Sequence, residues 1–134
     1  MKYIFCIDDK KGMMFFGKRQ SQDSALREWI LNHIQGSNLY MSSYSARQFE
    51  GASGFISDDN YENTMSVGDY CFVEDKGYSL NLCSEVIICK WNRKYQADKF
   101  FNEDLKSEGF TKVSSEDITG SSHEKITIEI WRRM

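Results

Sequence analysis

The last third of the chain constrains the fold most, because it carries the clearest strand patterns in the sequence. Residues 85–91 are rich in β-branched side chains, which is typical of a strand in the middle of a sheet. In residues 126–131 isoleucine recurs at every second position, so this segment is expected to bury one face. Together with residues 110–113 it predicts an antiparallel pair that closes the sheet.

Strand and helix patterns alternate in the first two thirds of the chain. Residues 2–7 form an apolar, β-rich run, and shorter strands are expected at residues 38–41, 55–57 and 69–73. Residues 58–68 are polar and acidic, which indicates a loop or a single helical turn. Strands that alternate with helices and end in an antiparallel pair predict a three-layer α/β fold with a mixed sheet.

One helix is predicted strongly and a second one is expected to be brief. Asp23 or Ser24 can cap the first helix, and Gly36 suits the left-handed position beyond its end. A brief helix is expected within residues 42–49. The apolar face of the first helix follows the helical spacing and consists of Leu26, Trp29, Ile30, His33 and Ile34.

Length and composition exclude several classes of protein. The 134 residues are expected to form a single domain, 1–134. No apolar run approaches the roughly 20 residues that cross a bilayer, so we expect a cytoplasmic protein without membrane contact. A net charge of −3 argues against nucleic-acid binding, and two histidines with four scattered cysteines argue against a metal site. The cysteines are expected to be reduced core thiols.

Several segments, taken in order, resemble the dihydrofolate reductase family. The run A-D-K-F-F-N is close to the family's G-D-T-F-F-P, and I-D-D-K-K-G is similar to the end of its first strand and the loop that follows. The segment N-L-Y-M-S-S-Y-S-A-R-Q-F-E-G resembles P-V-I-M-G-R-x-T-x-E-S-I-G. Further similar segments are D-Y-C-F-V-E-D-K-G-Y and L-C-S-E-V-I-I-C-K.

The resemblance implies a three-layer, dihydrofolate reductase-like α/β fold with a mixed, mostly parallel sheet and a C-terminal antiparallel hairpin. It also implies NAD(P)H-dependent reduction of a pterin-like substrate as one candidate activity. The chain is shorter than the family pattern, and the deficit falls between Gly51 and Gly68. A strand and a helix that support the adenine side of the cofactor are expected to be missing or reduced there.

The sequence departs from the family at the positions that hold cofactor and substrate. The tandem glycine that lets the backbone approach the pyrophosphate is replaced by residues 74–77, which contain two carboxylates and one glycine. Ser42 and Ser43 replace a glycine and an arginine, and Cys89 replaces a threonine. Residues 51–54 offer no arginine for a folate carboxylate. NADPH therefore remains a candidate cofactor whose glycine-rich corner is missing.

Asp23 is the one candidate for a catalytic acid. It lies at the start of the first helix, near the place where the family has its pterin-binding carboxylate. An ungapped count back from Leu31 puts Leu26 at that place instead. Asp23 is therefore either a carboxylate that faces a ligand or a helix cap.

Two segments have the composition of an anion site. The first precedes the N-terminus of the first helix and combines two cations with an amide; the second is a serine cluster at the start of the brief helix. Each can equally be a solvated loop or a cluster that caps its own backbone. The candidate ligand-binding residues are Lys18, Arg19, Gln20, Ser42, Ser43 and Ser45.

Three further features have no clear functional pattern. His33 lies on the apolar helix face, where a core or boundary role is expected. His123 lies in a hairpin loop beside two serines, and no third group indicates a Ser-His-acid site. Residues 13–16, Met-Met-Phe-Phe, lie in an expected loop at residues 8–17. They are either an apolar patch for a partner or part of the core.

Two hypotheses of function follow from the sequence. The first is a non-catalytic module that binds a small anionic or heteroaromatic ligand or a protein; the second is a reductase with an altered phosphate site. An open cleft from the Gly77 corner to Asp23 would favour the reductase. A cleft filled by side chains such as Phe15, Phe16 or Tyr78 would favour the module. The short middle segment is also expected to expose an edge strand, which predicts a homodimer.

Overall fold

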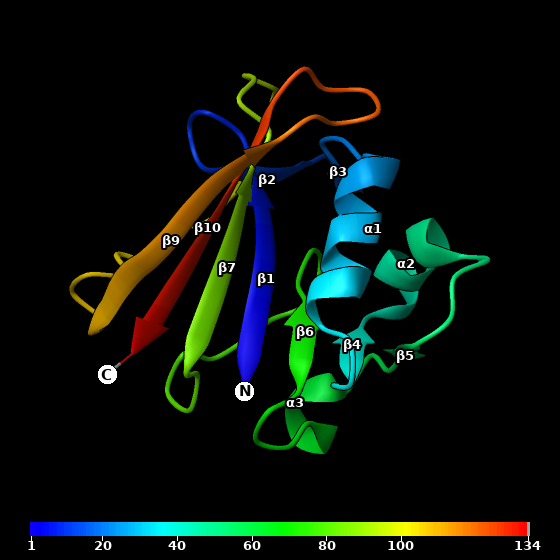
Figure 1. Ribbon diagram of the computed structural model, residues 1–134, viewed down its shortest axis with the longest axis vertical. Helices are drawn as coiled ribbons and strands as arrows, with labels where there is room; N and C mark the ends of the chain where they lie inside the picture. The colour runs from blue at the N-terminus through cyan, green and yellow to red at the C-terminus, as the bar shows by residue number, and fades with distance from the viewer. Residues whose placement is uncertain (134) are drawn as a thin grey trace.

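In the computed structural model, which describes residues 1–133, the described strands form two sheets (Figure 1). The main sheet has seven strands in the order β5-β4-β6-β1-β7-β10-β9, and a small sheet has the order β3-β2-β8. The main strands are β1 (Lys2–Ile7), β4 (Leu39–Met41), β5 (Phe55–Ser57), β6 (Tyr70–Phe72), β7 (Glu85–Lys90), β9 (Phe110–Ile118) and β10 (Ile126–Arg133).

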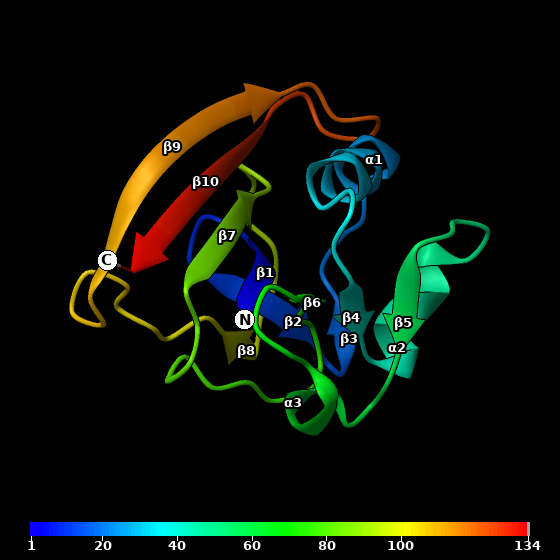
Figure 2. The same cartoon turned by 60° about the horizontal axis from the view of Figure 1, so that its bottom comes forward.

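The main sheet is mixed and mostly parallel, as the sequence predicted. The strands β5, β4, β6, β1 and β7 run parallel to one another, and β10 pairs antiparallel with both β7 and β9. The β9–β10 hairpin curves over one end of the sheet in Figure 2. Strand β9 is longer than the expected residues 110–113, because its polar second half pairs with β10 without being buried.

Helix α1 (Ser24–His33) covers one face of the main sheet, as the helical spacing predicted. Its buried residues Leu26 and Ile30 belong to a core that also contains Ile87 and Ile128. The alternation along each strand separates the two faces, so neighbouring residues in β7 and β10 point to opposite sides. His33 is an exception to the expected apolar face, because it is exposed and stacks on Trp29 instead.

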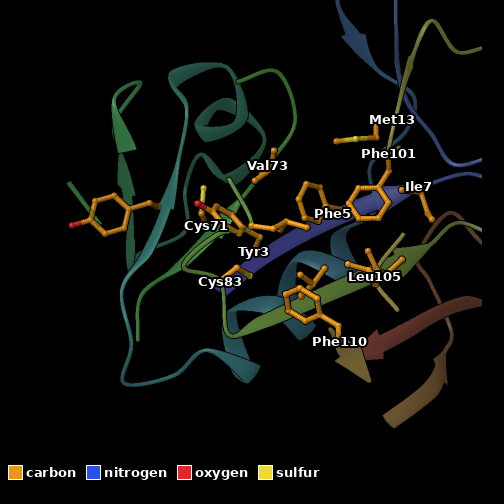
Figure 3. Close-up of a cluster of buried hydrophobic side chains, with 14 of the residues drawn as sticks. Tyr3, Phe5, Ile7, Met13, Cys71, Val73, Cys83, Phe101, Leu105 and Phe110 are labelled. Carbon is orange, nitrogen blue, oxygen red and sulfur yellow. The ribbon is translucent and has the colours of Figure 1, made fainter. Parts of the chain in front are cut away.

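The opposite face of the main sheet has its own core (Figure 3). Tyr3 and Phe5 of β1 pack there against side chains from connecting segments, such as Phe101 and Leu105. The small sheet and α3 (Tyr61–Thr64) also lie on this side, and Tyr61 of α3 is buried in the same core. This face of the main sheet is therefore covered by the small sheet, by α3 and by connecting segments.

The expected loop at residues 8–17 is wrong, because part of it forms the small sheet. Strand β2 (Gly12–Phe15) pairs with β3 (Lys18–Arg19) and with β8 (Lys99–Phe100). The Met-Met-Phe-Phe segment is divided between core and surface: Met13 and Met14 are buried, whereas Phe15 is 39% and Phe16 is 83% exposed. Whether the exposed phenylalanines contact a ligand or partner stays a prediction. Strand pairing at long range gives this segment a structure that its charged surroundings do not indicate.

The brief helix predicted within residues 42–49 is confirmed as α2 (Ser43–Ala46) followed by a 3₁₀ helix, η1 (Arg47–Phe49). Strand β5 is the edge strand expected from the short middle segment, and its Ile56 is 38% exposed. Whether β5 pairs with a second copy stays a prediction. No helix among residues 1–133 is long and apolar enough to cross a membrane.

Candidate functional site

The candidate site lies where the parallel strands end, beside the start of α1. Strand β1 ends before Asp8, β4 before Ser42, β6 shortly before Glu74, and β7 before Trp91. The carboxyl ends of parallel strands are the usual place for ligands in open α/β sheets. In this chain the same region is filled by a network of polar side chains.

Asp23 caps α1 and is at the same time the anchor of the β9–β10 loop, which lies against the start of α1 in Figures 1 and 2. Its Oδ1 accepts hydrogen bonds from the backbone N–H groups of Ala25, Leu26 and Ser121. Its Oδ2 accepts from the Ser122 N–H and pairs with the His123 ring. A fully buried side chain with this many partners has no lone pair left for a ligand.

The electrostatics of Asp23 agree with this role. Burial alone would raise its pKa, but the N–H groups of Ser121 and Ser122 and the bond from His123 outweigh burial. They hold the pKa well below the usual range. The carboxyl group is therefore ionised at any physiological pH. Gly120 fits this anchor, because a Cβ at that position would lie 2.5 Å from Asp23 Oδ2.

His123 joins two groups in a way that the sequence did not indicate. Its Nδ1 lies 2.9 Å from Asp23 Oδ2, and its Nε2 lies 3.0 Å from Ser21 Oγ and 3.1 Å from Tyr95 Oη. With the Nδ1 proton directed to Asp23, Nε2 accepts from the two hydroxyls. The sequence indicated no third group for a Ser-His-acid arrangement, and the structure supplies one from a distant segment: Asp23 is the acid, and the serine is Ser21.

The Ser-His-Asp arrangement nevertheless has no room for a substrate. Ser21 borders two voids of about 10 Å³ each, which is about the space of one water molecule or less. His123 is buried and stacks on Trp91 with 4.6 Å between ring centroids. The three residues therefore act together as a polar anchor between the hairpin loop and α1.

Arg19 is paired with a carboxylate of the chain itself. Its Nε and Nη2 donate to the two oxygens of Glu74 at 3.0 and 3.1 Å, and its guanidinium lies over the Tyr44 ring. Burial would lower the pKa of Arg19, but the bonds to Glu74 raise it. Glu74 also accepts from Ser45 Oγ at 2.8 Å. A bidentate pair of this kind satisfies the donors that would otherwise bind a phosphate.

The serine cluster is likewise satisfied by carboxylates of the chain. Ser42 Oγ donates to Asp75 at 2.6 Å, and the Ser43 N–H and hydroxyl both donate to Asp59. The start of α2 therefore already faces negative charge from within the molecule. Whether the cluster binds an external ligand stays a prediction.

The other two candidates lie apart from this network or at its rim. Lys18 is exposed on β3, at the edge of the small sheet. Gln20 donates to Asp8 at 3.0 Å and to the Gln96 carbonyl at 3.1 Å, while its Oε1 is buried without a partner among the described residues. The structure thus brings Arg19, Gln20 and Ser45 to one end of the sheet but does not bring Lys18 there.

The space between the Glu74 corner and Asp23 is closed. The only hollows found there among residues 1–133 are the two small voids, which are lined by Cys6, Arg19, Glu74 and Trp91 among others. The side chains expected to fill it do not: Phe16 is exposed, and Tyr78 packs on Phe5 on the opposite face of the sheet. The filling comes from the Arg19–Glu74 pair and Trp91.

An open groove of about 300 Å³ remains between α1 and η1. Arg27 and Gln48 line both this groove and one of the small voids, so they mark its inner end. The Gln48 amide makes no hydrogen bond within residues 1–133, and its Nε2 is buried. Arg27 makes one long bond, 3.4 Å to Gln22 Oε1. The groove therefore has polar donors that the protein leaves free.

The arrangement of strands and helices identifies the fold. Over 98% of its length the chain is similar to a solved structure of dihydrofolate reductase from Enterococcus faecalis complexed with NADP(H) and RAB-propyl, with a TM-score of 0.69. The match covers 95% of that chain at 11% sequence identity. The chain has the dihydrofolate reductase fold. No family model matches the sequence, and no curated protein does.

At the corner after β6, where the sequence resemblance leads us to expect a departure from the family pattern, the side chains of Glu74 and Asp75 turn back onto Ser45 and Ser42. Cys89 is buried and lies in register with Cys6 of β1. All four cysteines are free thiols. The hydrogen bond between the Cys6 and Cys89 thiols, together with burial, raises the pKa of Cys6.

Proposed function

We propose that the chain is a non-catalytic, cytoplasmic binder of a small ligand, which it takes up in the groove between α1 and η1. The observation that carries this proposal is the state of Asp23. The sequence offers no other candidate for an acid that polarises a pterin, and all of its lone pairs are engaged within the protein. Proton donation to a substrate requires a group within hydrogen-bond reach of it.

The filled cofactor region supports the same conclusion. A dinucleotide there would have to displace the bidentate Arg19–Glu74 pair and the Ser42–Asp75 bond. It would also bring its phosphates against two carboxylates, and like charges in contact cost several kcal/mol. We therefore expect neither NADH nor NADPH to bind at physiological concentrations.

The groove suggests the chemistry of its ligand. The inner end presents the Arg27 guanidinium and the Gln48 amide, whereas Glu28 and Glu50 line only the outer part. A ligand with a carboxylate or phosphate at its inner end would pair with Arg27 and satisfy the buried Gln48 nitrogen. Giving an unsatisfied buried donor an acceptor recovers about 1–3 kcal/mol, so we expect the inner end to contribute most of the binding free energy.

The test is a binding series on the full chain by isothermal titration calorimetry, with p-aminobenzoyl-glutamate and dihydrofolate as probes. We expect binding in the wild type, and we expect Arg27→Gln and Gln48→Met each to weaken it about tenfold. Arg47→Gln is the matched control, because Arg47 is exposed on η1 and outside the groove.

Equal binding by the Arg27→Gln and Arg47→Gln variants would show that the groove is not the site. Oxidation of NADPH by the wild type in the presence of dihydrofolate would overturn the non-catalytic assignment and restore the reductase. If neither probe binds, the ligand proposal fails and a protein-interaction module remains.

A further inference from the structure

A second hollow, of about 210 Å³, lies on the face of the main sheet opposite α1. It shares no lining residue with the groove or with the two small voids. Its apolar floor is formed by Ile7, Ile88, Phe101 and Leu105, which belong to the core of that face, and Trp131 of β10 forms one wall. Figure 3 shows Ile7, Phe101 and Leu105 beside one another at this end of the core.

The polar side of this hollow is built around a buried carboxylate. Glu129 is 5% exposed, and it accepts from Lys90 Nζ at 3.0 Å, Lys112 Nζ at 3.3 Å and Trp131 Nε1 at 3.1 Å. Burial would raise the pKa of Glu129, but the bonds from Lys90 and Trp131 lower it. The carboxylate is therefore charged, and it holds two ammonium groups at the sheet surface.

The ammonium groups near the hollow are only partly engaged by hydrogen bonds and ion pairs within the chain. Glu129 shares itself between Lys90 and Lys112, which leaves each lysine with further N–H donors directed to solvent. Lys11 and Lys106 also line the hollow, and neither makes an ion pair or side-chain hydrogen bond within residues 1–133.

The acidic side chains at the rim are, in contrast, already engaged. Asp104 accepts from Ser107 Oγ at 2.9 Å, and Glu103 accepts from the Tyr78 hydroxyl at 3.3 Å. The lining contains three ammonium groups and three carboxylates, and among these six groups only Lys11 and Lys106 make no side-chain hydrogen bond within residues 1–133. An apolar floor beside two unpartnered ammonium groups favours a ligand that is apolar at one end and anionic at the other.

We propose that this hollow, bounded by β7, β10 and residues 101–106, binds a small aromatic carboxylate. The ring would rest on Ile88, Phe101 and the Trp131 indole, and the carboxylate would lie between Lys11, Lys90 and Lys106. The volume is below the roughly 300–1,000 Å³ of drug-sized sites, so one aromatic ring with a short acid side chain is the size that fits.

The experiment compares three probes that share a phenyl ring and a two-carbon side chain and that are anionic, neutral and cationic in turn: phenylacetate, phenylacetamide and phenethylamine. Binding to the ¹⁵N-labelled full chain is followed through the indole N–H signals, and Trp131→Phe identifies the signal of Trp131. We expect phenylacetate to move the Trp131 signal and to bind about tenfold more tightly than the neutral amide, while the amine does not bind. Acetate alone should leave the signal in place.

The lysines are tested with a pair of double variants that have the same net charge. Lys11→Gln with Lys106→Gln is expected to weaken phenylacetate about tenfold, whereas Lys76→Gln with Lys94→Gln, two exposed lysines elsewhere, should change nothing. All four side chains are exposed, so both variants should fold.

Three results would overturn the proposal. The first is equal affinity for phenylacetate and phenylacetamide, and the second is equal loss in the two double variants. The third is a titration up to millimolar phenylacetate in which the Trp131 signal stays in place, whether the signal of Trp29 or Trp91 moves instead or no indole signal moves.

Discussion

Two regions of the molecule use their charged side chains in opposite ways. At the carboxyl ends of the parallel strands, beside the start of α1, Arg19 pairs with Glu74 and Asp23 pairs with His123, and the voids that border this closed network measure only about 10 Å³ each. On the face of the main sheet opposite α1, Lys11 and Lys106 have no ion pair within residues 1–133, and a hollow of about 210 Å³ lies beside them.

The difference shows how charged groups at the carboxyl ends of the strands can be paired within the chain itself. Charged donors at the carboxyl ends of the strands are costly to bury unless something pairs with them. In this chain the pairing carboxylates are Glu74, which follows β6, and Asp23, which caps α1. Recognition of other molecules is then expected where donors remain free, in the α1–η1 groove and beneath residues 101–106.

The largest expected effect is that of Asp23→Asn, which removes a buried negative charge from the closed network. The amide can no longer accept all the N–H groups that meet Asp23, and it leaves His123 without its anion. We expect a loss of about 3 kcal/mol in the free energy of unfolding, measured by urea denaturation. Asp9→Asn, at an exposed position, is the control and should change little.

A loss equal to that of the control would mean that Asp23 is not an anchor, and it would make a ligand-facing role credible again.

Glu74→Gln is expected to cost about 2 kcal/mol, because the Arg19 guanidinium would lose a bidentate partner while it is only 18% exposed. Thermal unfolding should show a lower midpoint than for Glu116→Gln, whose parent residue is exposed on β9. An unchanged midpoint would indicate that the Arg19–Glu74 pair contributes nothing to closure.

Between pH 5 and pH 3, protonation linked to Asp23 should lower the free energy of unfolding by about 1–2 kcal/mol. The pKa of Asp23 in the folded protein lies below its ordinary value of 3.8. Its stabilisation is therefore complete above that value and is lost as the pH falls towards the folded pKa. Urea denaturation of the wild type should show this decline, and Asp23→Asn should show a shallower one. Parallel declines would contradict the assignment.

The smallest expected effect is that of Phe16→Asn at the tip of the β2–β3 hairpin. Phe16 has φ 55° and is followed by Gly17 with φ 74°, a turn that favours Asn-Gly. Since the Phe16 ring is 83% exposed, little packing is lost, and we expect stability to stay equal or rise by about 0.5 kcal/mol. A clear loss would mean that the Phe15–Phe16 contact supports the hairpin.

Local periodicity explains which parts of the fold could be predicted. The apolar spacing of α1, the β-branched run of β7 and the alternation in β10 each depend on neighbours in sequence, and each segment forms where it was expected. The β2–β3–β8 sheet was missed because its strands are very short and because β2 pairs with β8 across more than eighty residues. No local pattern reports such a pairing.

The candidate site was predictable only as a set of residue types. Arg19, Gln20 and the serines after β4 were recognised as groups that bind anions, and Asp23 as a group that caps a helix. Their partners could not be read from the sequence, because Glu74 lies 55 residues from Arg19 and His123 lies 100 residues from Asp23. The Ser121-Ser122-His123 run was noted in the sequence, but nothing near it in sequence indicates its partner Asp23.

The most direct test of our proposal that the closed network excludes a dinucleotide is the thermal unfolding midpoint of the wild type with and without millimolar NADPH. A ligand at about 100 times its dissociation constant would add about 2.7 kcal/mol, or several degrees. We predict no shift in the wild type. A shift of several degrees would contradict the account, because the cofactor would then be able to displace the carboxylates of Glu74 and Asp75.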